Sequence, residues 1–237
     1  MSYLLKVEIK EHNFDYFPYN LPLFLKPKTI EFSKPITFIV GENGSGKSTF
    51  FESLAKAVGF NVKGGNANHK FDSQEEQDVS EVLKLSWRIK SNQGFFFRAE
   101  SFFDFSNYID KLMDEDANIK VAYGNKKLTH QSHGESFLSL FANKFKNGLF
   151  ILDEPEAALS PERQMSLITV LNDLTKKYNA QFIIATHSPI LISAPNSILY
   201  EIEGDELIEK EYKDTKQFRL YKDFLSSPER YIKYLTE

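Results

Sequence analysis

The sequence predicts an α/β fold with a mostly parallel central sheet, an N-terminal antiparallel β layer and a small helical inserted lobe. Alternating apolar and polar residues at 4–10 and 29–32 are typical of half-buried strands and indicate the antiparallel layer. A nearly continuous apolar run at 35–40 indicates a strand that is covered on both faces. A strand, a helix and a second strand follow one another over residues 149–185, and this βαβ pattern requires parallel strands.

Length and composition fit a single domain spanning residues 1–237. The 41% of hydrophobic and 26% of charged residues are ordinary for globular proteins and exclude disordered and fibrous classes. A net charge of −4 provides no overall positive field, so nucleic acid as a partner is possible but not supported. Cysteine is absent, the start lacks the pattern of a signal peptide, and no stretch of about 18 apolar residues occurs. We therefore expect a soluble, cytoplasmic protein without a membrane span.

The remaining elements follow from local patterns. A helix is expected at 48–58, and the polar stretch 61–77 has no period and is expected to be a loop. The central segment is expected to form two antiparallel strands and a helix, at 82–89, 94–98 and 103–116, and to contribute to the lobe, which we place at about 99–147. The last part is expected to contain a helix at 161–178, a hairpin of strands 197–202 and 206–211, and a helical tail from Phe218.

A glycine-rich turn follows the apolar strand 35–40. Residues 41–49 match G-x-x-x-x-G-K-[ST], the P-loop pattern, between a predicted strand and a predicted helix. The glycines allow backbone N–H groups to point at phosphate oxygens beside the positive end of the helix dipole. Lys47 adds a full positive charge, and the hydroxyl of Ser48 is a ligand that Mg²⁺ prefers. We therefore predict a P-loop NTPase whose nucleotide and Mg²⁺ contact Asn43, Gly44, Ser45, Gly46, Lys47, Ser48 and Thr49.

Polar residues end two strands of the predicted sheet, at the carboxyl edge where α/β folds place their ligands. Asp153 and Glu154 follow the strand at 149–152, and His187 follows the strand at 181–185. Asp153 is expected to bind Mg²⁺ through water, and Glu154 to orient or deprotonate the water that attacks the γ-phosphate. His187 is expected to donate a hydrogen bond to the γ-phosphate or to that water. Alone, the acidic pair would be interpreted as a solvated strand end; the P-loop upstream favours the catalytic interpretation.

Ser132 and Glu135 fit a capping box at the start of a helix. The buried stripe of that helix is expected to consist of Phe137, Leu138, Phe141 and Phe145. A helix start with a serine hydroxyl and open N–H groups beside Gly134 is also a suitable second anion site. The residues alone favour the capping interpretation.

The order of P-loop, serine-glycine helix start, Asp-Glu strand end and His strand end resembles the ATP-binding-cassette (ABC) ATPases over about residues 28–200. In that family the signature serine and glycine of one subunit close over the γ-phosphate bound by the P-loop of another. The resemblance implies that Ser132, Gly134 and Glu135 bind the nucleotide of a second copy, and that residues 157–160 form a turn that contacts it. It also implies ATP hydrolysis and an ATP-dependent head-to-tail homodimer, which acts as a conformational switch for a protein partner.

The spellings Gly-Glu-Asn-Gly at 41–44, Asp-Glu-Pro-Glu at 153–156 and Thr-His-Ser-Pro at 186–189 are similar to soluble members, the SMC, RecF and Rad50-like and OLD-like predicted AAA-family ATPases. The chain lacks a long coiled-coil insert, and residues 98–101 contain no glutamine where the family has its glutamine loop. Two alternatives remain open: the nucleotide-binding subunit of an ABC transporter, and a largely non-hydrolysing ATP-binding assembly module. The aromatic residue that stacks on adenine is also left open among Phe14, Tyr16, Phe17 and Tyr19.

Overall fold

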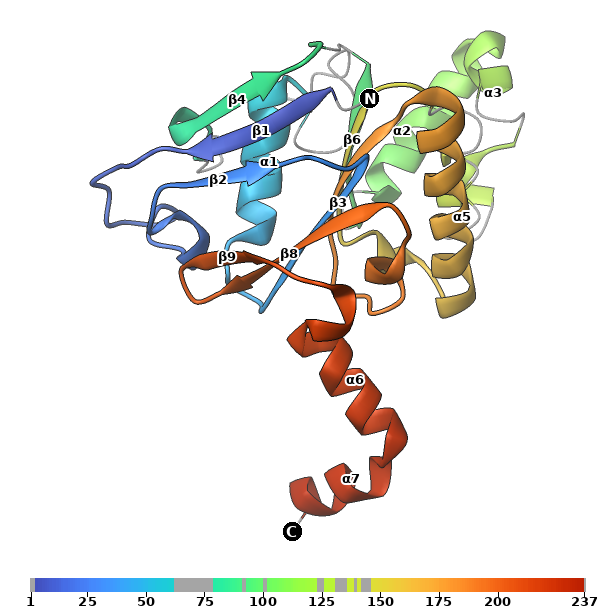
Figure 1. Ribbon diagram of the computed structural model, residues 1–237. Coiled ribbons are helices and arrows are strands. Elements are labelled where there is room, and N and C mark those ends of the chain that lie inside the picture. The colour runs from blue at the N-terminus through green and yellow to red at the C-terminus, as the bar shows by residue number, and fades with distance from the viewer. Residues whose placement is uncertain are drawn as a thin grey trace.

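Two β-sheets organise the chain, as a computed structural model shows (Figure 1). The structure describes residues 3–61, 79–90, 93–99, 102–122, 126–130, 136–138, 140–141 and 146–236. The larger sheet has six strands in the order β5 (Gly94–Arg98), β6 (Leu149–Asp153), β7 (Gln181–Ala185), β3 (Ile36–Gly41), β8 (Ser197–Glu203) and β9 (Glu206–Glu209). Neighbouring strands from β5 to β8 are parallel, and β8 pairs with β9 as an antiparallel hairpin. The prediction of a mostly parallel central sheet is confirmed.

The smaller sheet has three antiparallel strands in the order β2 (Lys28–Glu31), β1 (Leu4–Ile9) and β4 (Leu83–Trp87). Alternate residues of β1 are buried, namely Leu4, Val7 and Ile9 with one irregularity in the register, as expected for a sheet with one covered face. The prediction of an N-terminal antiparallel layer is confirmed.

The prediction of an antiparallel strand at 94–98 is wrong. β5 pairs in parallel register with β6, from Gly94 opposite Leu149 to Arg98 opposite Asp153. Phe95, Phe96 and Phe97 are all buried, because this strand is covered on both faces. β4 is antiparallel but pairs with β1, so neither strand contributes to an inserted lobe. The apolar pattern along a strand indicates its burial but not the direction of its partner.

Helices cover both faces of the larger sheet. α1 (Lys47–Val58) lies between the two sheets, where Phe50, Phe51 and Leu54 are fully buried together with residues of both (Figure 1). α5 (Pro161–Tyr178) covers the opposite face and buries Leu167 and Leu171 against the sheet. The fold thus has the layers expected of an α/β domain.

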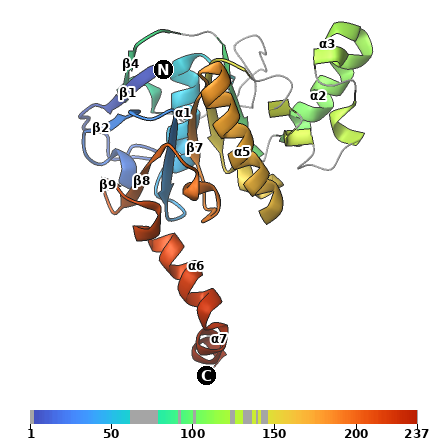
Figure 2. The same cartoon turned by 45° about the vertical axis from the view of Figure 1, so that its right-hand side comes forward.

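A helical segment lies beside the edge strand β5. α2 (Phe102–Glu115) and α3 (Ala117–Ala122) stand to one side of the sheets in Figure 2. Within it the carboxylate of Asp110 accepts hydrogen bonds from the backbone N–H groups of Leu128 and Thr129, at 2.7 and 3.0 Å. Both helices fall within the range 99–147 where we expect the lobe; the extent of the lobe and the single-domain organisation stay predictions.

The predicted helical tail is confirmed, with a break before Pro228. α6 (Lys216–Ser226) and α7 (Pro228–Thr236) extend away from both sheets (Figures 1 and 2). The buried Thr215 caps α6 by accepting a hydrogen bond from the N–H of Phe218 at 3.2 Å. No described residue of either helix is buried. No helix in the described ranges has both the length and the apolar character needed to cross a membrane.

The parallel pairing places the carboxyl ends of β3, β6 and β7 at one edge of the larger sheet. Gly41, Asp153 and Ala185 are the last residues of these strands. The glycine-rich turn, Glu154 and His187 therefore follow at the same edge, where α/β folds bind ligands.

Candidate functional site

The glycine-rich turn is shaped by two residues with positive φ. Gly44 has φ +77° and Gly46 has φ +99°, a region that residues with side chains rarely adopt. Gly46 directly precedes α1, and a side chain there would approach Leu21 and Leu23 to 3.3 Å. The N–H of Leu23 also donates to the carbonyl of Ser45 at 3.1 Å. The turn at residues 22–24 thus packs on the loop and holds it in this form.

Lys47 is the first residue of α1 and is 4% exposed. Its Nζ donates to the carbonyl oxygens of Gly41 and Glu42, at 2.8 and 2.9 Å. Burial lowers the pKa of Lys47, while the negative charges of Glu154, Asp153 and Glu156 raise it. Because an ammonium group has three donors, one N–H remains for an anion beside the loop.

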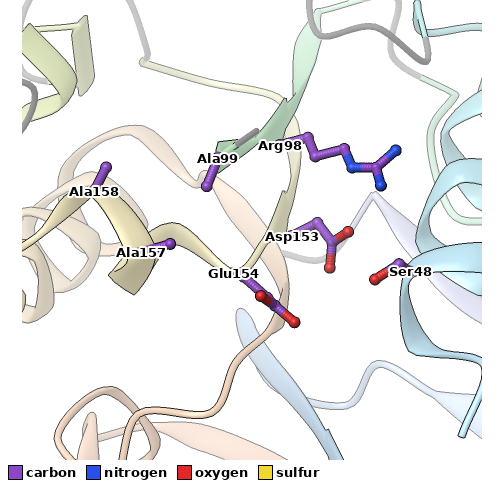
Figure 3. A pocket seen from close by; sticks show the side chains of 7 residues that line it. All are labelled: Ser48, Arg98, Ala99, Asp153, Glu154, Ala157 and Ala158. Atoms are coloured by element: carbon purple, nitrogen blue, oxygen red, sulfur yellow. The ribbon is translucent and has the colours of Figure 1, made fainter. Parts of the chain in front are cut away.

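Asp153 lies opposite Ser48, and the two side chains point toward one another (Figure 3). Asp153 is 3% exposed, and its pKa is raised to about 7, chiefly by burial and also by the charge of Glu154, against the opposing effects of Arg98 and of a hydrogen bond from Ser48. Its Oδ1 is buried without a hydrogen-bond partner among the described residues. An orphaned carboxylate oxygen beside a hydroxyl fits Mg²⁺, which prefers oxygen ligands. The described ranges hold no group of three or more histidine, cysteine, aspartate or glutamate side chains that could hold a metal ion, so water and phosphate would complete the coordination.

Two cavities meet at Ser48 and Glu154. One of about 430 Å³ is lined by Ser48, Arg98, Ala99, Asp153, Glu154, Ala157 and Ala158. The other, of about 290 Å³, is lined by Phe17, Leu21, Asn43, Gly44, Gly46, Lys47, Ser48, Thr49 and Glu154. The structure thus brings the glycine-rich turn and the acidic pair to one place.

Glu154 and His187 also lie together. The distance between Glu154 Oε1 and His187 Nε2 is 3.5 Å. Glu154 has φ +51°, an unusual conformation for a residue other than glycine, asparagine or aspartate. Burial lowers the pKa of His187, as does the charge of Lys47, while Glu154 opposes both. The imidazole is therefore neutral at pH 7 and has one N–H donor.

Ser132, Gly134 and Glu135 lie outside the described residues, and so does Phe145. The rest of the predicted stripe is confirmed, since Phe137 and Phe141 are buried and Leu138 is partly buried against the same core. Ser160 caps α5, accepting a hydrogen bond from the N–H of Arg163 at 3.4 Å.

Two residues near the site were not assigned a role from the sequence. Arg98 extends from the end of β5 toward α1, where it forms an ion pair with Glu52 (Figure 3). An assignment of β5 as a parallel strand would have placed Arg98 at the ligand edge. Phe17 is the aromatic residue among the four candidates that lines the cavity of the glycine-rich turn. Phe14, Tyr16 and Tyr19 instead pack on one another, with ring centroids 4.6 to 5.6 Å apart.

Comparisons with known proteins agree with this fold. The family model described as "AAA domain, putative AbiEii toxin, Type IV TA system" matches residues 76–193, which include Asp153, Glu154 and His187. The lipoprotein-releasing system ATP-binding protein LolD of Buchnera aphidicola is 28% identical over 198 residues, which cover 74% of this chain and 84% of LolD.

Two solved structures share the fold at low sequence identity. An ATP-binding cassette of an ABC transporter in its ADP conformation has a TM-score of 0.53 and 18% identity, with 100% of both chains covered. An SMC head bound to the C-winged helix domain of ScpA has a TM-score of 0.53 and 14% identity, covering 89% of this chain and 98% of that one. By its motifs and these similarities, the chain resembles ATP-binding proteins of the ABC type, and it has the fold of their P-loop ATPase domains.

Proposed function

We propose that this chain binds ATP with Mg²⁺ at the carboxyl edge of its larger sheet and hydrolyses the bond between the β- and γ-phosphates. One observation carries the proposal: residues of the glycine-rich turn, Asp153 and Glu154 line two adjoining cavities, and His187 lies 3.5 Å from Glu154. Each side chain has the chemistry that phosphoryl transfer to water requires.

The turn at residues 43–49 binds the phosphates. Backbone N–H groups at the start of α1 point along the positive end of the helix dipole, which favours phosphate oxygens. Lys47 adds the remaining N–H donor of its ammonium group. Ser48 and Asp153 would hold Mg²⁺, which supplies positive charge between the outer phosphates when it is bound.

Glu154 and His187 act at the γ-phosphate. The carboxylate of Glu154 lines both cavities and accepts a hydrogen bond from the attacking water, which it orients or deprotonates. The neutral imidazole of His187 donates its N–H to the γ-phosphate or to that water. Phe17, which lines the cavity of the glycine-rich turn, stacks its ring on adenine in this proposal.

A second copy of the chain completes the site in this proposal. The two cavities are open at the sheet edge, and a site from which water is excluded gives stronger stabilisation of the transition state. Ser132, Gly134 and Glu135 of one copy would contact the nucleotide of the other, so ATP binding and homodimer formation are linked. The dimer would then act as a cytoplasmic switch for a protein partner.

The similarity to LolD, the ATP-binding protein of a lipoprotein-releasing system, supports one alternative: this chain is the nucleotide-binding subunit of a transporter. Copurification with a membrane protein would favour that function. The third candidate is an assembly module that binds ATP and hardly hydrolyses it. The experiment below distinguishes it from a hydrolysing ATPase.

Phosphate release under single-turnover conditions tests hydrolysis. Purified chain is mixed with less than one equivalent of ATP and with Mg²⁺, and the nucleotide is followed to completion. We expect conversion to ADP by the natural chain, bound but intact ATP with Glu154→Gln, and no binding with Lys47→Ala. Glu162→Gln, at an exposed position of α5, is the control. Bound ATP that stays intact in the natural chain would favour the assembly module instead.

A further inference from the structure

The turn that carries His187 is held by side chains from the segment after the acidic pair. Glu156 Oε1 accepts a hydrogen bond from the backbone N–H of His187 at 2.5 Å. The hydroxyl of Thr186, which is fully buried, also donates to the carboxylate of Glu156. The same hydroxyl oxygen accepts the N–H of Ser188 at 3.0 Å. Thus Glu156 contacts two successive residues of the turn, one through its backbone and one through its side chain.

A second contact ties the same two segments together. Ser188 Oγ donates to Gln164 Oε1 at 2.5 Å, and Gln164 Nε2 donates to the carbonyl of Leu159 at 3.1 Å. Ser188 Oγ also accepts the N–H groups of Ile190 and Leu191, at 3.1 and 3.0 Å. Thr186 and His187 are therefore hydrogen-bonded to the side chain of Glu156, and Ser188 is hydrogen-bonded to the side chain of Gln164.

Burial of the Glu156 carboxylate at this position costs free energy. Its Oε2 is buried with no hydrogen-bond partner in the described part of the chain, and burial raises the pKa of Glu156. In a solvent-exposed loop, water would accept the hydrogen bond of the His187 N–H, and no carboxylate would need to be buried. A buried acceptor that contacts the histidine turn therefore indicates that the conformation of this turn matters.

We propose that Glu156 is a positioning residue that fixes the Thr186–Ser188 turn and thereby sets the imidazole of His187 against Glu154. The inference rests on the role of His187 at the γ-phosphate proposed above. Glu156 itself touches neither nucleotide nor water in this account. It acts by accepting two hydrogen bonds. An uncharged side chain of the same shape that keeps the acceptor oxygen should therefore preserve its effect.

Two substitutions of similar volume separate the acceptor from the charge. Glu156→Gln keeps the oxygen that receives both donors, whereas Glu156→Met fills the space without an acceptor. Glu162→Met is the matched control, because Glu162 is exposed on α5. Thr186→Val, which removes the donor from the other side with little change of shape, serves as a second variant if Glu156→Met does not fold.

We expect Glu156→Met to lower the single-turnover rate by about tenfold or more, with ATP affinity changed by less than about threefold. Glu156→Gln and Glu162→Met should stay close to the natural chain. In NMR titrations of the protein without nucleotide, the pKa of His187 should rise toward its ordinary value in Glu156→Met, since release of the turn relieves the burial that lowers it. His187→Gln identifies the signal.

Two results would overturn the assignment. In the first, His187 titrates in Glu156→Met, or in Thr186→Val if the former does not fold, as it does in the natural chain. In the second, Glu156→Gln is as impaired as Glu156→Met, which would make charge rather than hydrogen bonding the cause. If the natural chain does not hydrolyse ATP, the proposed function fails, and the titration of the protein without nucleotide still decides this inference.

Discussion

His187 Nε2 lies 3.5 Å from Glu154 Oε1 because two parallel strands end in register. Asp153, the last residue of β6, pairs with Ala185, the last residue of β7. The pairing continues one step further, where the N–H of Glu154 donates to the carbonyl of Ala185 at 3.0 Å. The strand pairing thus brings the backbones that carry the proposed base and the proposed γ-phosphate contact together at one sheet edge.

Replacing Lys47 should abolish nucleotide binding without unfolding the chain. Its ammonium group contacts only loop carbonyls among the described residues, so Lys47→Ala removes a buried charge and leaves the core intact. We expect ATP affinity to fall by about 100-fold or more, the effect of losing a charge-assisted contact to phosphate. Fluorescent ATP titration measures it, with Lys56→Ala, exposed on the same helix, as the control. Equal affinities of the two variants would remove Lys47 from the site.

Asp153 should destabilise the chain at high pH when neither Mg²⁺ nor nucleotide is present. Its pKa of about 7 in the folded state lies above the ordinary 3.8, so its favourable contribution is complete below pH 4 and lost as the pH rises through 7. Asp153→Asn should therefore raise the free energy of unfolding at pH 8 by on the order of 1–3 kcal/mol, and much less at pH 5.

Thermal unfolding of both proteins at the two pH values tests this expectation. Asp173→Asn is the control, because its carboxylate is half exposed on α5 and paired with Lys177. A destabilised Asp153→Asn variant at pH 8 would show that the charged carboxylate is well accommodated in the folded chain without a metal ion.

Phe17, and not its aromatic neighbours, should contribute to nucleotide affinity. Phe17 and Tyr16 are equally exposed, at 54% and 55%, but only Phe17 lines the cavity of the glycine-rich turn. Because stacking of a base on an aromatic ring is worth about 1–3 kcal/mol, Phe17→Ala should weaken ATP binding about 5- to 150-fold. Tyr16→Ala should leave the affinity unchanged. If calorimetry finds the opposite order, Phe17 does not contact adenine.

Removal of α7 should leave stability unchanged, although the helix carries large apolar side chains. Tyr234 and Leu235 are 87% and 78% exposed, and no residue of α7 is buried. The free energy of unfolding of a chain that ends at Ser227 should lie within about 0.5 kcal/mol of that of the full chain. Thr215→Ala should lower the free energy of unfolding more, by about 1 kcal/mol, because Thr215 is buried and caps α6. Denaturant unfolding compares the two, and a larger loss from the truncation would show that α7 packs on the body.

The sequence predicts the glycine-rich turn and the strand ends correctly because their signals are local. Glycine spacing, an apolar run before it and a helix after it suffice to place Lys47 and Ser48. The acidic pair and His187 each follow an apolar strand of a βαβ unit, so their common edge follows from the handedness and direction of the strands.

Features that depend on contacts between segments far apart in the chain could not be predicted from the sequence. Whether the strand at 94–98 is parallel depends on its neighbour β6, and the place of Arg98 depends on that pairing. Four aromatics near residues 14–19 look alike until the chain folds back on the glycine-rich turn, where only Phe17 reaches the cavity. The bond between Glu156 and His187 joins two loops whose spacing in the sequence carries no signal of contact.

The central claim is that ATP joins two copies of this chain, and the mass of Glu154→Gln in solution tests it most directly. This variant should bind ATP and Mg²⁺ without consuming them, so a dimer that forms will persist. Light scattering after size exclusion should give 27.4 kDa without nucleotide and twice that mass with ATP and Mg²⁺, while Glu154→Gln combined with Lys47→Ala stays at 27.4 kDa. A variant saturated with ATP that keeps the mass of a single chain would contradict the claim.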